Sequence, residues 1–444
     1  MTIIAIITAK LILKIVRVFG GGATTLPGRV ALKMKYNILN RLSKGVKIIC
    51  ITGTNGKTTT CALVEHAFRT LGFSYFINKS GANMISGVAS SFIENSSVFG
   101  RCKKEYAILE CDENSFPEIS RYLDARVVAV TNIFRDQLDR YGETENTLNT
   151  VLCAIKNMPE ATLVLNADCP LTYSLSEKCD NEIITFGVNA DFEKSFAEDN
   201  RFCPVCKSEL IYRSRVYAQL GNYFCPCCSF KRIYPDVCAE NIVSLDDSSS
   251  RFFVSKKTQN EPVSISLGGI YNIYNYCCSV AILNTLGIDD SGALSSFSGA
   301  FGRMEKFLGY GFEILLLLVK NPVGFSNCVS YVSKMKGDFS LVFALNDNEA
   351  DSTDVSWIWD VSFSKLRNPF CSFITIGKRS YDMALRLKYD GIQPSVMIDG
   401  EDYDRLVKTI KKQGKNTVVF ANYTSMMNMR KRFVATFGGK EFWE

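Results

Sequence analysis

Short apolar runs alternate with longer amphipathic segments along the chain after residue 45. Runs of Val, Ile and other apolar residues are typical of strands that are buried on both faces of a sheet. Such strands are predicted at 46–51, 73–77, 106–110, 125–131 and 162–166, with helices at about 58–71 and 85–92. This alternation indicates βαβ units, and therefore an α/β fold with a mostly parallel sheet.

The same pattern divides the chain into three parts. The alternation breaks at 202–232, where cysteines and turn residues cluster, and a second α/β pattern follows. Its strands are predicted at 314–319, 340–345, 373–376 and 416–421. We therefore expect an N-terminal segment at 1–45, a central domain at 46–308 that carries the cysteine-rich insertion, and a smaller Rossmann-like α/β domain at 309–444.

The N-terminal segment starts with an apolar stretch, MTIIAIITAKLILKIVRVFG. Lys10, Lys14 and Arg17 recur at helical spacing, with Ile and Leu at other positions. The longest uncharged run, residues 1–9, is far shorter than the ~20 residues that span a bilayer. Two interpretations remain open: the helix packs on the protein or a partner, or it lies on the inner surface of a membrane.

The composition excludes several kinds of chemistry. The 444 residues include 51 Lys or Arg and 45 Asp or Glu, a net charge of +6 that is too small to indicate nucleic-acid binding. There is one histidine, His66, in the middle of a predicted helix, so a Ser-His-Asp triad would have to use His66 and a His-rich metal centre cannot be assembled. The 17 cysteines are an odd number in mostly apolar contexts, which favours reduced thiols and a cytoplasmic location.

A phosphate-binding loop is predicted where the first central strand meets its helix. The sequence VKIICITGTNGKTTT places Gly53, Thr54, Asn55 and Gly56 in the loop, and Lys57, Thr58 and Thr59 at the start of the helix. The glycines let backbone N–H groups face phosphate oxygens, while the lysine reaches the outer phosphates and a threonine hydroxyl binds Mg²⁺. The loop is two residues shorter than the usual G-x-x-x-x-G-K-[ST] motif, but strand, loop and helix follow in the required order.

Four cysteines have metal-ligand spacing. Two C-x-x-C pairs, Cys203/Cys206 and Cys225/Cys228, are separated by 18 residues, as in zinc ribbons. Four thiolates complete a tetrahedral Zn²⁺, so the zinc would be structural and Cys227 would be a spare thiol. The few basic residues nearby favour a solvated face over a nucleic-acid surface. We expect loss of zinc to loosen the ribbon and to leave the phosphate loop intact.

These motifs resemble those of the Mur ligases and folylpolyglutamate synthetases. TGTNGKTTT is similar to their ATP loop, and similar motifs follow in the family's order: ECDEN (110–114), TNIFRDQLDRYGE (131–143), LNADCP (165–170), GGIYNIYN (268–275) and GRMEK (302–306). The resemblance implies a Mur ligase-type P-loop ATPase domain, which converts a carboxylate into an acyl phosphate that an amine then attacks. It further implies that Glu110 binds Mg²⁺, Asn272 contacts the adenine and Arg303 contacts the phosphates.

The chain departs from the family at two histidines. Gln137 stands between Asp136 and Asp139 where the family has D-H-L-D, and Tyr271 precedes Asn272 where the family has histidine. Both family histidines lie near metal or nucleotide. The usual second metal site is therefore not carried over to this chain.

An acidic segment of the C-terminal domain, LNDNEADSTDVSWIWDVS, follows a predicted strand. By itself it could be an acidic loop around buried indoles. With the cysteine ribbon and the GANM motif (81–84), however, it resembles the ligase-like subunits of the lipid II isoglutaminyl synthases. That resemblance implies a partner, a glutamine amidotransferase of the GatD type, whose Cys-His pair is completed by an aspartate of this chain. Asp354 is the first choice, followed by Asp351 and Asp347.

We therefore predict an ATP-dependent amide ligase with Mg²⁺ and a structural Zn²⁺. The resemblance implies that it amidates the D-Glu α-carboxylate of the lipid II stem peptide in a heterodimer with a glutaminase, because His66 cannot supply the base for glutamine hydrolysis. The chain would be cytoplasmic and could meet the inner membrane face. Two alternatives are a stand-alone ligase of the folylpolyglutamate type and a zinc-ribbon ATPase that binds nucleic acid.

Overall fold

The computed structural model describes most of the chain. The described residues are 2–18, 24–78, 82–134, 143–190, 202–245, 249–256, 259–290, 292–297, 304–335, 337–348, 351, 353–367 and 371–438. The chain divides into two units, one of residues 1–135 and 140–299 and the other of 136–139 and 300–444.

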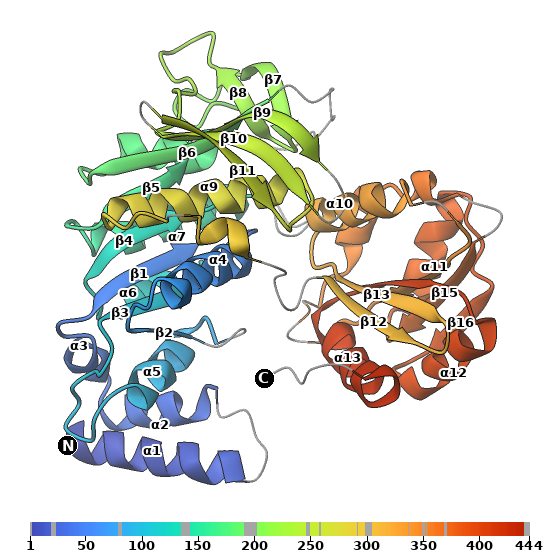
Figure 1. Cartoon of the computed structure of the whole chain (residues 1–444), viewed down its shortest axis with the longest axis horizontal. Helices are drawn as coiled ribbons and strands as arrows, with labels where there is room; N and C mark the ends of the chain where they lie inside the picture. The colour runs from blue at the N-terminus through green and yellow to red at the C-terminus, as the bar shows by residue number, and fades with distance from the viewer. Residues whose placement is uncertain are drawn as a thin grey trace. The chain divides into compact units, whose positions relative to one another are not determined.

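A nine-stranded sheet forms the first unit as far as its residues are described (Figure 1). The strand order is β11-β10-β9-β6-β5-β4-β1-β3-β2. The strands are β1 (Lys47–Thr52), β2 (Tyr75–Ile77), β3 (Tyr106–Glu110), β4 (Ala125–Val130), β5 (Thr162–Asn166), β6 (Ile183–Asn189), β9 (Val237–Leu245), β10 (Ser250–Lys256) and β11 (Gln259–Ile265). All pairs from β2 to β9 are parallel, which confirms the predicted mostly parallel sheet.

The antiparallel extension β9-β10-β11 has no counterpart among the predicted strands. Residues along β9 change from buried to alternately half-buried and exposed, so this strand lacks the continuous apolar run of β1 or β5. A strand with one solvated face carries a weaker pattern than a strand buried on both faces. Strand β6, which lies between β5 and β9, was also not predicted, whereas the edge strand β2 was.

Helices α4 (Lys57–Thr70) and α9 (Ile270–Thr285) lie side by side on one face of this sheet (Figure 1). Helix α1 (Thr2–Val18) packs on α2 (Leu26–Met34) and on α5 (Ile85–Glu94). The other helices of the unit are α3 (Ile38–Leu42), α6 (Phe116–Ser120), α7 (Glu143–Lys156), α8 (Pro170–Tyr173), η1 (Ser174–Glu177) and η2 (Leu294–Ser296). Within the described residues, every helix is too short or too polar to cross a membrane.

The cysteine-rich segment forms a small subdomain around the hairpin of β7 (Ile211–Tyr217) and β8 (Leu220–Phe224). Its core consists of Leu210, Tyr223 and Phe230 with buried Cys203 and Cys225. A core this small buries little apolar area, so such a subdomain usually needs a metal or another cross-link.

The second unit contains a six-stranded sheet with the order β12-β13-β17-β14-β15-β16 in its described part. Its strands are β12 (Met304–Gly309), β13 (Phe312–Leu318), β14 (Ser340–Ala344), β15 (Ser372–Gly377), β16 (Val396–Asp399) and β17 (Thr417–Ala421). Only the β12–β13 pair is antiparallel. Two apolar clusters cover opposite faces. One involves α10 (Pro322–Val332), α11 (Ser380–Tyr389) and the short helices η4 (Ser356–Asp360) and η5 (Ser364–Leu366), and the other α12 (Tyr403–Gln413) and α13 (Tyr423–Phe437).

Candidate active site

The predicted phosphate loop joins β1 to α4 at the carboxyl edge of the parallel sheet. Two of its positions have a positive φ, Gly53 (+119°) and Gly56 (+90°). A Cβ atom on Gly56 would lie 2.2 Å from Oδ1 of Asn275 on α9. Because L side chains avoid this backbone region and no space is left for a Cβ, both conformation and packing require glycine at position 56.

The segment that follows β4 holds the loop in place. The amide N–H of Thr54 donates to the carbonyl of Asn132 (2.9 Å), and the N–H of Asn55 donates to the Asn132 side chain (2.9 Å). The hydroxyl of Thr131 donates to the carbonyl of Asn55 (2.7 Å). Phe134 exchanges hydrogen bonds with the Thr54 hydroxyl. Thr131 and Asn132 open the TNIFRDQLDRYGE motif, but the sequence alone assigned them no role.

Lys57 is buried at the start of α4, with 5% of its surface exposed. Its Nζ donates to the carbonyl of Gly53 (2.5 Å) and pairs with the carboxylate of Glu113 (3.0 Å), which is also largely buried. Glu110 was predicted to lie in the site, but Glu113, three residues later in the same motif, was not. The ion pair holds the lysine head group against the loop.

Glu110 ends β3 directly beside the loop, since it is paired in register with Ile51 of β1. It is 8% exposed, and among the described residues its carboxylate has no hydrogen-bond or ion-pair partner. A buried carboxylate without a protein partner is costly unless it is neutralised. Carboxylate oxygens are the ligands that Mg²⁺ prefers, so Glu110 fits the predicted metal role, together with the hydroxyl of Thr58 at the first turn of α4.

Helix α9 brings the predicted adenine-contacting residue to the same edge. The amide of Asn275, which packs against Gly56, donates to the Asn272 side chain (3.2 Å), and Asn272 in turn donates to the carbonyl of Gly268 (2.7 Å). Asn275 was not predicted, although it belongs to the same GGIYNIYN motif. Arg303 and the segment Asp136–Asp139 lie outside the described residues.

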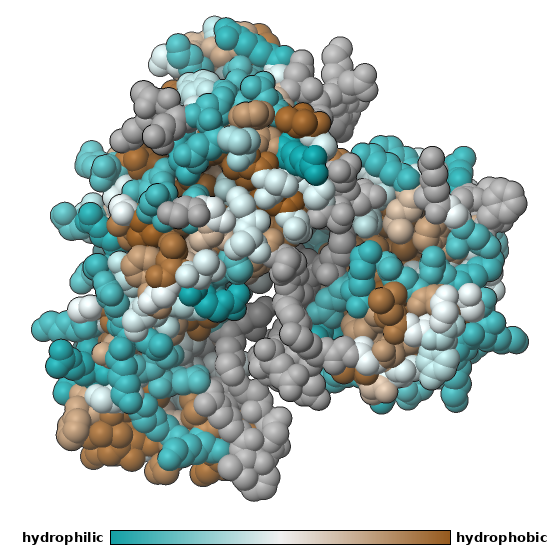
Figure 2. All heavy atoms as spheres, in the orientation of Figure 1, coloured by the Kyte–Doolittle hydropathy of each residue, from teal (hydrophilic) through white to brown (hydrophobic). Residues whose placement is uncertain are grey.

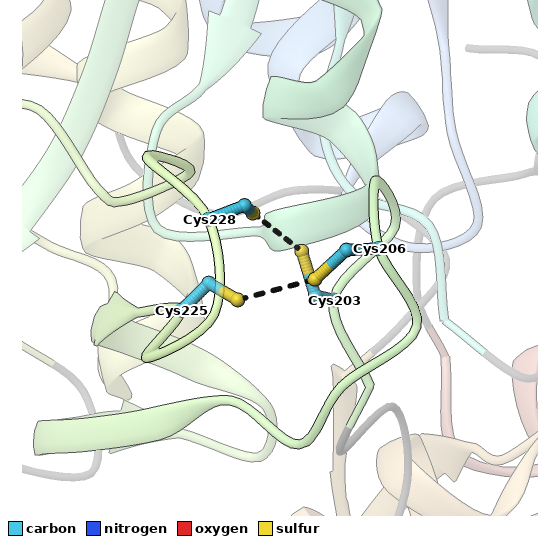
Figure 3. A group of neighbouring side chains, drawn as sticks. All are labelled: Cys203, Cys206, Cys225 and Cys228. Atoms are coloured by element: carbon cyan, nitrogen blue, oxygen red, sulfur yellow. Dashed lines mark hydrogen bonds between the residues drawn. The ribbon is translucent and has the colours of Figure 1, made fainter.

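Four cysteines converge from two loops, as Figure 3 shows. The Sγ atoms of Cys203, Cys206, Cys225 and Cys228 all lie within 4.8 Å of one another, with Cys203–Cys228 at 3.6 Å and Cys206–Cys225 at 3.4 Å. Zn–S bonds of about 2.3 Å give a tetrahedron with edges of about 3.8 Å, whereas a disulfide bond is only about 2.05 Å long. The four thiols therefore fit a Zn²⁺ ion. A hydrogen bond with Ser208 lowers the pKa of the Cys206 thiol, and Cys227 is exposed beside the cluster.

The hairpin β7–β8 of the ribbon forms its own two-stranded sheet, but the ribbon also contacts the segment after β4 that holds the phosphate loop. The buried amide of Gln219 donates to the carbonyl of Ile133 (2.7 Å), and the ring of Tyr217 packs edge-on against Phe134 (5.9 Å between centroids). Arg232 forms a buried ion pair with Asp168 (2.6 Å) after β5. A disordered ribbon would therefore remove direct supports of the residues that hold the loop.

The three candidate aspartates of the second unit differ in their contacts. Asp351 accepts hydrogen bonds from the N–H and hydroxyl of Thr424 at the start of α13, and burial raises its pKa. Asp347 faces the guanidinium of Arg379 at 3.6 Å. Asp354 accepts the N–H of Ser356 (2.8 Å), and hydrogen bonds from Ser356 lower its pKa. Asp351 is therefore bound to the first turn of α13, whereas the hydrogen bonds of Asp354 are to Ser356, two residues further along the same segment.

An aromatic surface adjoins the aspartate segment. Trp359 of η4 is 44% exposed and packs edge-on against Tyr389 of α11 (5.1 Å between centroids). Tyr381, Leu385 and Tyr389 recur every four residues along α11 and are all exposed. By contrast, Trp357 is buried in the core, so only one indole of the acidic segment is available to a partner.

His66 is half-buried on α4 against neighbouring side chains. Its ring nitrogens lie 2.8 Å from the Ser296 hydroxyl and 3.1 Å from the Arg69 guanidinium, and its ring meets Phe297 edge-on. Burial and the nearby Arg69 lower the pKa of its imidazole.

Comparison with known proteins identifies relatives of both units. The Mur ligase middle domain family matches residues 51–223, and the MurT ligase C-terminal family matches residues 318–426. The MurT subunit of the glutamine-hydrolyzing lipid II isoglutaminyl synthase of Streptococcus pneumoniae is 37% identical over 422 residues, which cover 93% of this chain and 92% of that protein. The MurT subunit of Staphylococcus aureus strain COL is 33% identical over 443 residues, which cover 98% of both chains.

Solved structures share the fold at lower sequence identity. A pseudomurein peptide ligase type C from Methanothermus fervidus superimposes with a TM-score of 0.68 at 22% identity, covering 90% of this chain and 80% of that chain. MurF from Acinetobacter baumannii gives a TM-score of 0.66 at 16% identity, covering 93% and 81%. The nine-stranded and six-stranded sheets are thus those of the Mur ligase fold.

Proposed function

The chain belongs to the MurT family, and on that premise we propose that it is the ATP-consuming subunit of a glutamine-hydrolysing lipid II isoglutaminyl synthase. The supporting observation is full-length similarity to MurT subunits in a chain with a complete phosphate loop. Lys57 and Glu110 are both buried at the edge of the sheet where that loop begins. The activity is that of an ATP-dependent carbon–nitrogen ligase.

The reaction has two steps. An oxygen of the D-Glu α-carboxylate of the stem peptide attacks the γ-phosphorus of ATP, the bond to the β-phosphate oxygen breaks, and ADP leaves. Ammonia then attacks the acyl carbon, inorganic phosphate leaves with the carbon–oxygen bond electrons, and a proton passes to solvent. The product is D-isoglutamine. The protein contributes position and charge, because no histidine base is available at this site.

The residues of the phosphate loop have separate roles in this reaction. Backbone N–H groups at the start of α4 face the phosphates, since those of Thr54 and Asn55 already donate to Asn132, and Lys57 neutralises charge on the transferred group. Glu110 and the Thr58 hydroxyl would hold Mg²⁺, which neutralises phosphate charge when bound. Glu113 keeps the Lys57 ammonium oriented, while Asn272 contacts the adenine and Arg303 the phosphates.

Nitrogen comes from a glutaminase partner of the GatD type that contacts the C-terminal domain, residues 309–444. Asp354 completes the partner's Cys-His pair by holding the imidazole in the productive tautomer. Its hydrogen bonds are local, to Ser356, which supports this choice over Asp351, because Asp351 is bound to Thr424 at the start of α13. The exposed Trp359 and Tyr389 have the amphipathic aromatic character of interface anchors.

The cysteine ribbon holds one structural Zn²⁺ through its four thiolates, in the insertion at 202–232. The tetrahedral spacing of the sulfur atoms and the very small apolar core support this assignment. The reaction takes place at the inner face of the plasma membrane, because the stem-peptide substrate is lipid-linked.

The test is product analysis with two nitrogen sources. The chain, alone and in complex with a GatD-type partner, is supplied with ATP, Mg²⁺ and detergent-solubilised lipid II. Ammonium should support amidation without the partner, and glutamine only with it, with one ADP formed per amide. Transfer of an amino acid to a soluble acid, or ATP hydrolysis that depends on nucleic acid and forms no amide, would instead establish one of the two alternatives.

A further inference from the structure

Helix α1 is apolar on two opposite faces. Ala5, Ile6, Ala9 and Leu13 are buried in its contacts with α2 and α5. On the other side Ile4, Ile7, Leu11 and Ile15 form a stripe at helical spacing, each 42–60% exposed. A helix that covers one side of a soluble protein is normally polar on its outer face. The outer stripe of α1 (Ile4, Ile7, Leu11 and Ile15) therefore needs an explanation outside the chain's own core.

The loop after α5 extends this apolar surface. Phe99 is 68% exposed and Val98 44%. The loop is tied to the N-terminal helices by two hydrogen bonds, from Arg41 to the carbonyl of Phe99 (2.9 Å) and from Lys10 to the carbonyl of Ser96 (2.6 Å). Figure 2 shows hydrophobic side chains gathered over α1 at the lower end of the view. The stripe and the Phe99 loop thus belong to one end of the first unit.

The positive charge of the chain is concentrated in the same segment. Residues 1–46 contain eight Lys or Arg and no Asp or Glu, whereas the remaining 398 residues have 43 basic and 45 acidic side chains. The net +6 of the whole chain therefore comes entirely from its first tenth. A shallow depression of about 480 Å³ at the start of α1 is lined by Lys35, Arg41 and Lys44 with Thr2, Asn37 and Asn40.

We infer that the outer stripe of α1, the Phe99 loop and this basic depression form a docking surface for a bilayer of anionic phospholipid. Apolar side chains of an interfacial helix enter the acyl boundary of a membrane, while flanking Lys and Arg side chains pair with anionic head groups. The polar, cationic lining of the depression suits a phosphate head group. The inference rests on the proposed function in one respect: a lipid-linked substrate gives the chain a reason to bind the membrane.

A second copy of this chain is a poorer occupant. Two copies joined through this surface would bring together segments that each carry eight positive charges and no acidic side chain. An anionic bilayer presents the opposite charge.

The test measures sedimentation of the full chain, in its complex with the glutaminase partner, with vesicles. Vesicles of phosphatidylglycerol and phosphatidylcholine (1:1) are compared with vesicles of phosphatidylcholine alone, without ATP or lipid II. Two variants probe the two parts of the surface: Leu11→Gln/Ile15→Gln and Lys35→Gln/Lys44→Gln. The matched control, Val243→Gln/Leu308→Gln, changes two side chains that are at least as exposed but lie elsewhere, on β9 and β12.

We expect the wild type and the control to bind anionic vesicles. Each surface variant should bind them with an affinity at least about tenfold lower. Binding should fall when salt is raised to 0.5 M, because screening weakens head-group attraction. Wild type that stays in the supernatant, equal binding to both vesicle types, or an α1 variant that binds like wild type would each overturn the inference. An oligomer of the wild-type chain that dissociates in the α1 variant, with no binding to vesicles, would also overturn it. Such a result would make a second copy of the chain the occupant of the surface.

Amidation of detergent-solubilised lipid II by the same variants separates this inference from the proposed function. Both surface variants should amidate the micellar substrate at the wild-type rate, which also shows that they are folded. If the wild type bound vesicles but formed no amide, the proposed function would be refuted and the docking surface would still be supported.

Discussion

Replacing Lys57 with alanine tests the phosphate loop most directly. Lys57 is nearly fully buried, and its Nζ contacts both the Gly53 carbonyl and the Glu113 carboxylate. The substitution therefore does two things at once: it removes the cation that neutralises the transferred phosphoryl group, and it leaves Glu113 buried without its partner.

The two effects have different magnitudes. Removing one electrostatic contact to a transition state typically costs about 3–4 kcal/mol, or about 10²–10³ in kcat. Breaking a fully buried ion pair costs about 3–5 kcal/mol of folding stability. The Glu113 side chain keeps 13% of its surface exposed, so we expect a cost at or slightly below the bottom of that range, about 2–3 kcal/mol. For a unit of this size that lowers the Tm by roughly 4–12 °C, which leaves the protein folded at assay temperature.

The double variant Lys57→Ala/Glu113→Gln separates the two effects. A neutral amide at position 113 no longer needs a cation, so the double variant should regain most of the lost Tm and none of the lost turnover. The assays are thermal unfolding followed by circular dichroism, and amide formation with ammonium as the nitrogen source. Turnover near the wild-type rate in Lys57→Ala, or turnover restored in the double variant, would refute the assignment of Lys57 to the phosphates.

Three further predictions concern the partner, the ribbon and the thiols. Asp354→Asn should lower glutamine-driven amidation by orders of magnitude and leave ammonium-driven amidation unchanged. Asp351→Asn and Asp347→Asn are the matched controls. An equal loss in both assays would mean that Asp354 serves the ligase site or the fold. Metal analysis should find one Zn²⁺ per chain, and the variant Cys203→Ser/Cys206→Ser should contain none. The same variant should have a higher KM for ATP, because the ribbon supports the segment that holds the phosphate loop. An unchanged KM would contradict this link between the ribbon and the loop. At pH 8 a thiol reagent should modify the exposed Cys227 and leave Cys61 unmodified, as measured by mass spectrometry. Burial raises the pKa of the Cys61 thiol and also blocks access to it. Rapid labelling of Cys61 would show instead that α4 separates from the residues that bury this thiol.

The order of strands and helices could be predicted from the sequence because it depends on local patterns. The apolar run of β1 and the glycines before α4 are adjacent in the chain, and backbone geometry alone connects them. The two C-x-x-C pairs likewise identify a metal-binding candidate by spacing. Members of the family are recognisable from such motifs, and the relatives confirmed that membership.

Only the tertiary structure revealed what holds these motifs in place. Glu113 pairs with Lys57 across 56 residues, Asn275 packs on Gly56 from a helix more than 200 residues away, and Gln219 links the ribbon to Ile133. Glu113 and Asn275 lie in recognisable motifs, but no local pattern shows which residues they contact, because an ion pair or hydrogen bond between distant residues depends on which strand edges and helix faces pack together.

The two faces of α1 show the same division. The sequence predicts an apolar helix with a few basic residues. It does not decide whether this helix packs on protein or lies on a membrane. The structure shows that Ala5 and Leu13 are buried by neighbouring helices while Leu11 and Ile15 remain exposed. Apolar character is a property of the residue, but burial depends on which neighbours the fold supplies, and that is why the outer stripe became visible only in three dimensions.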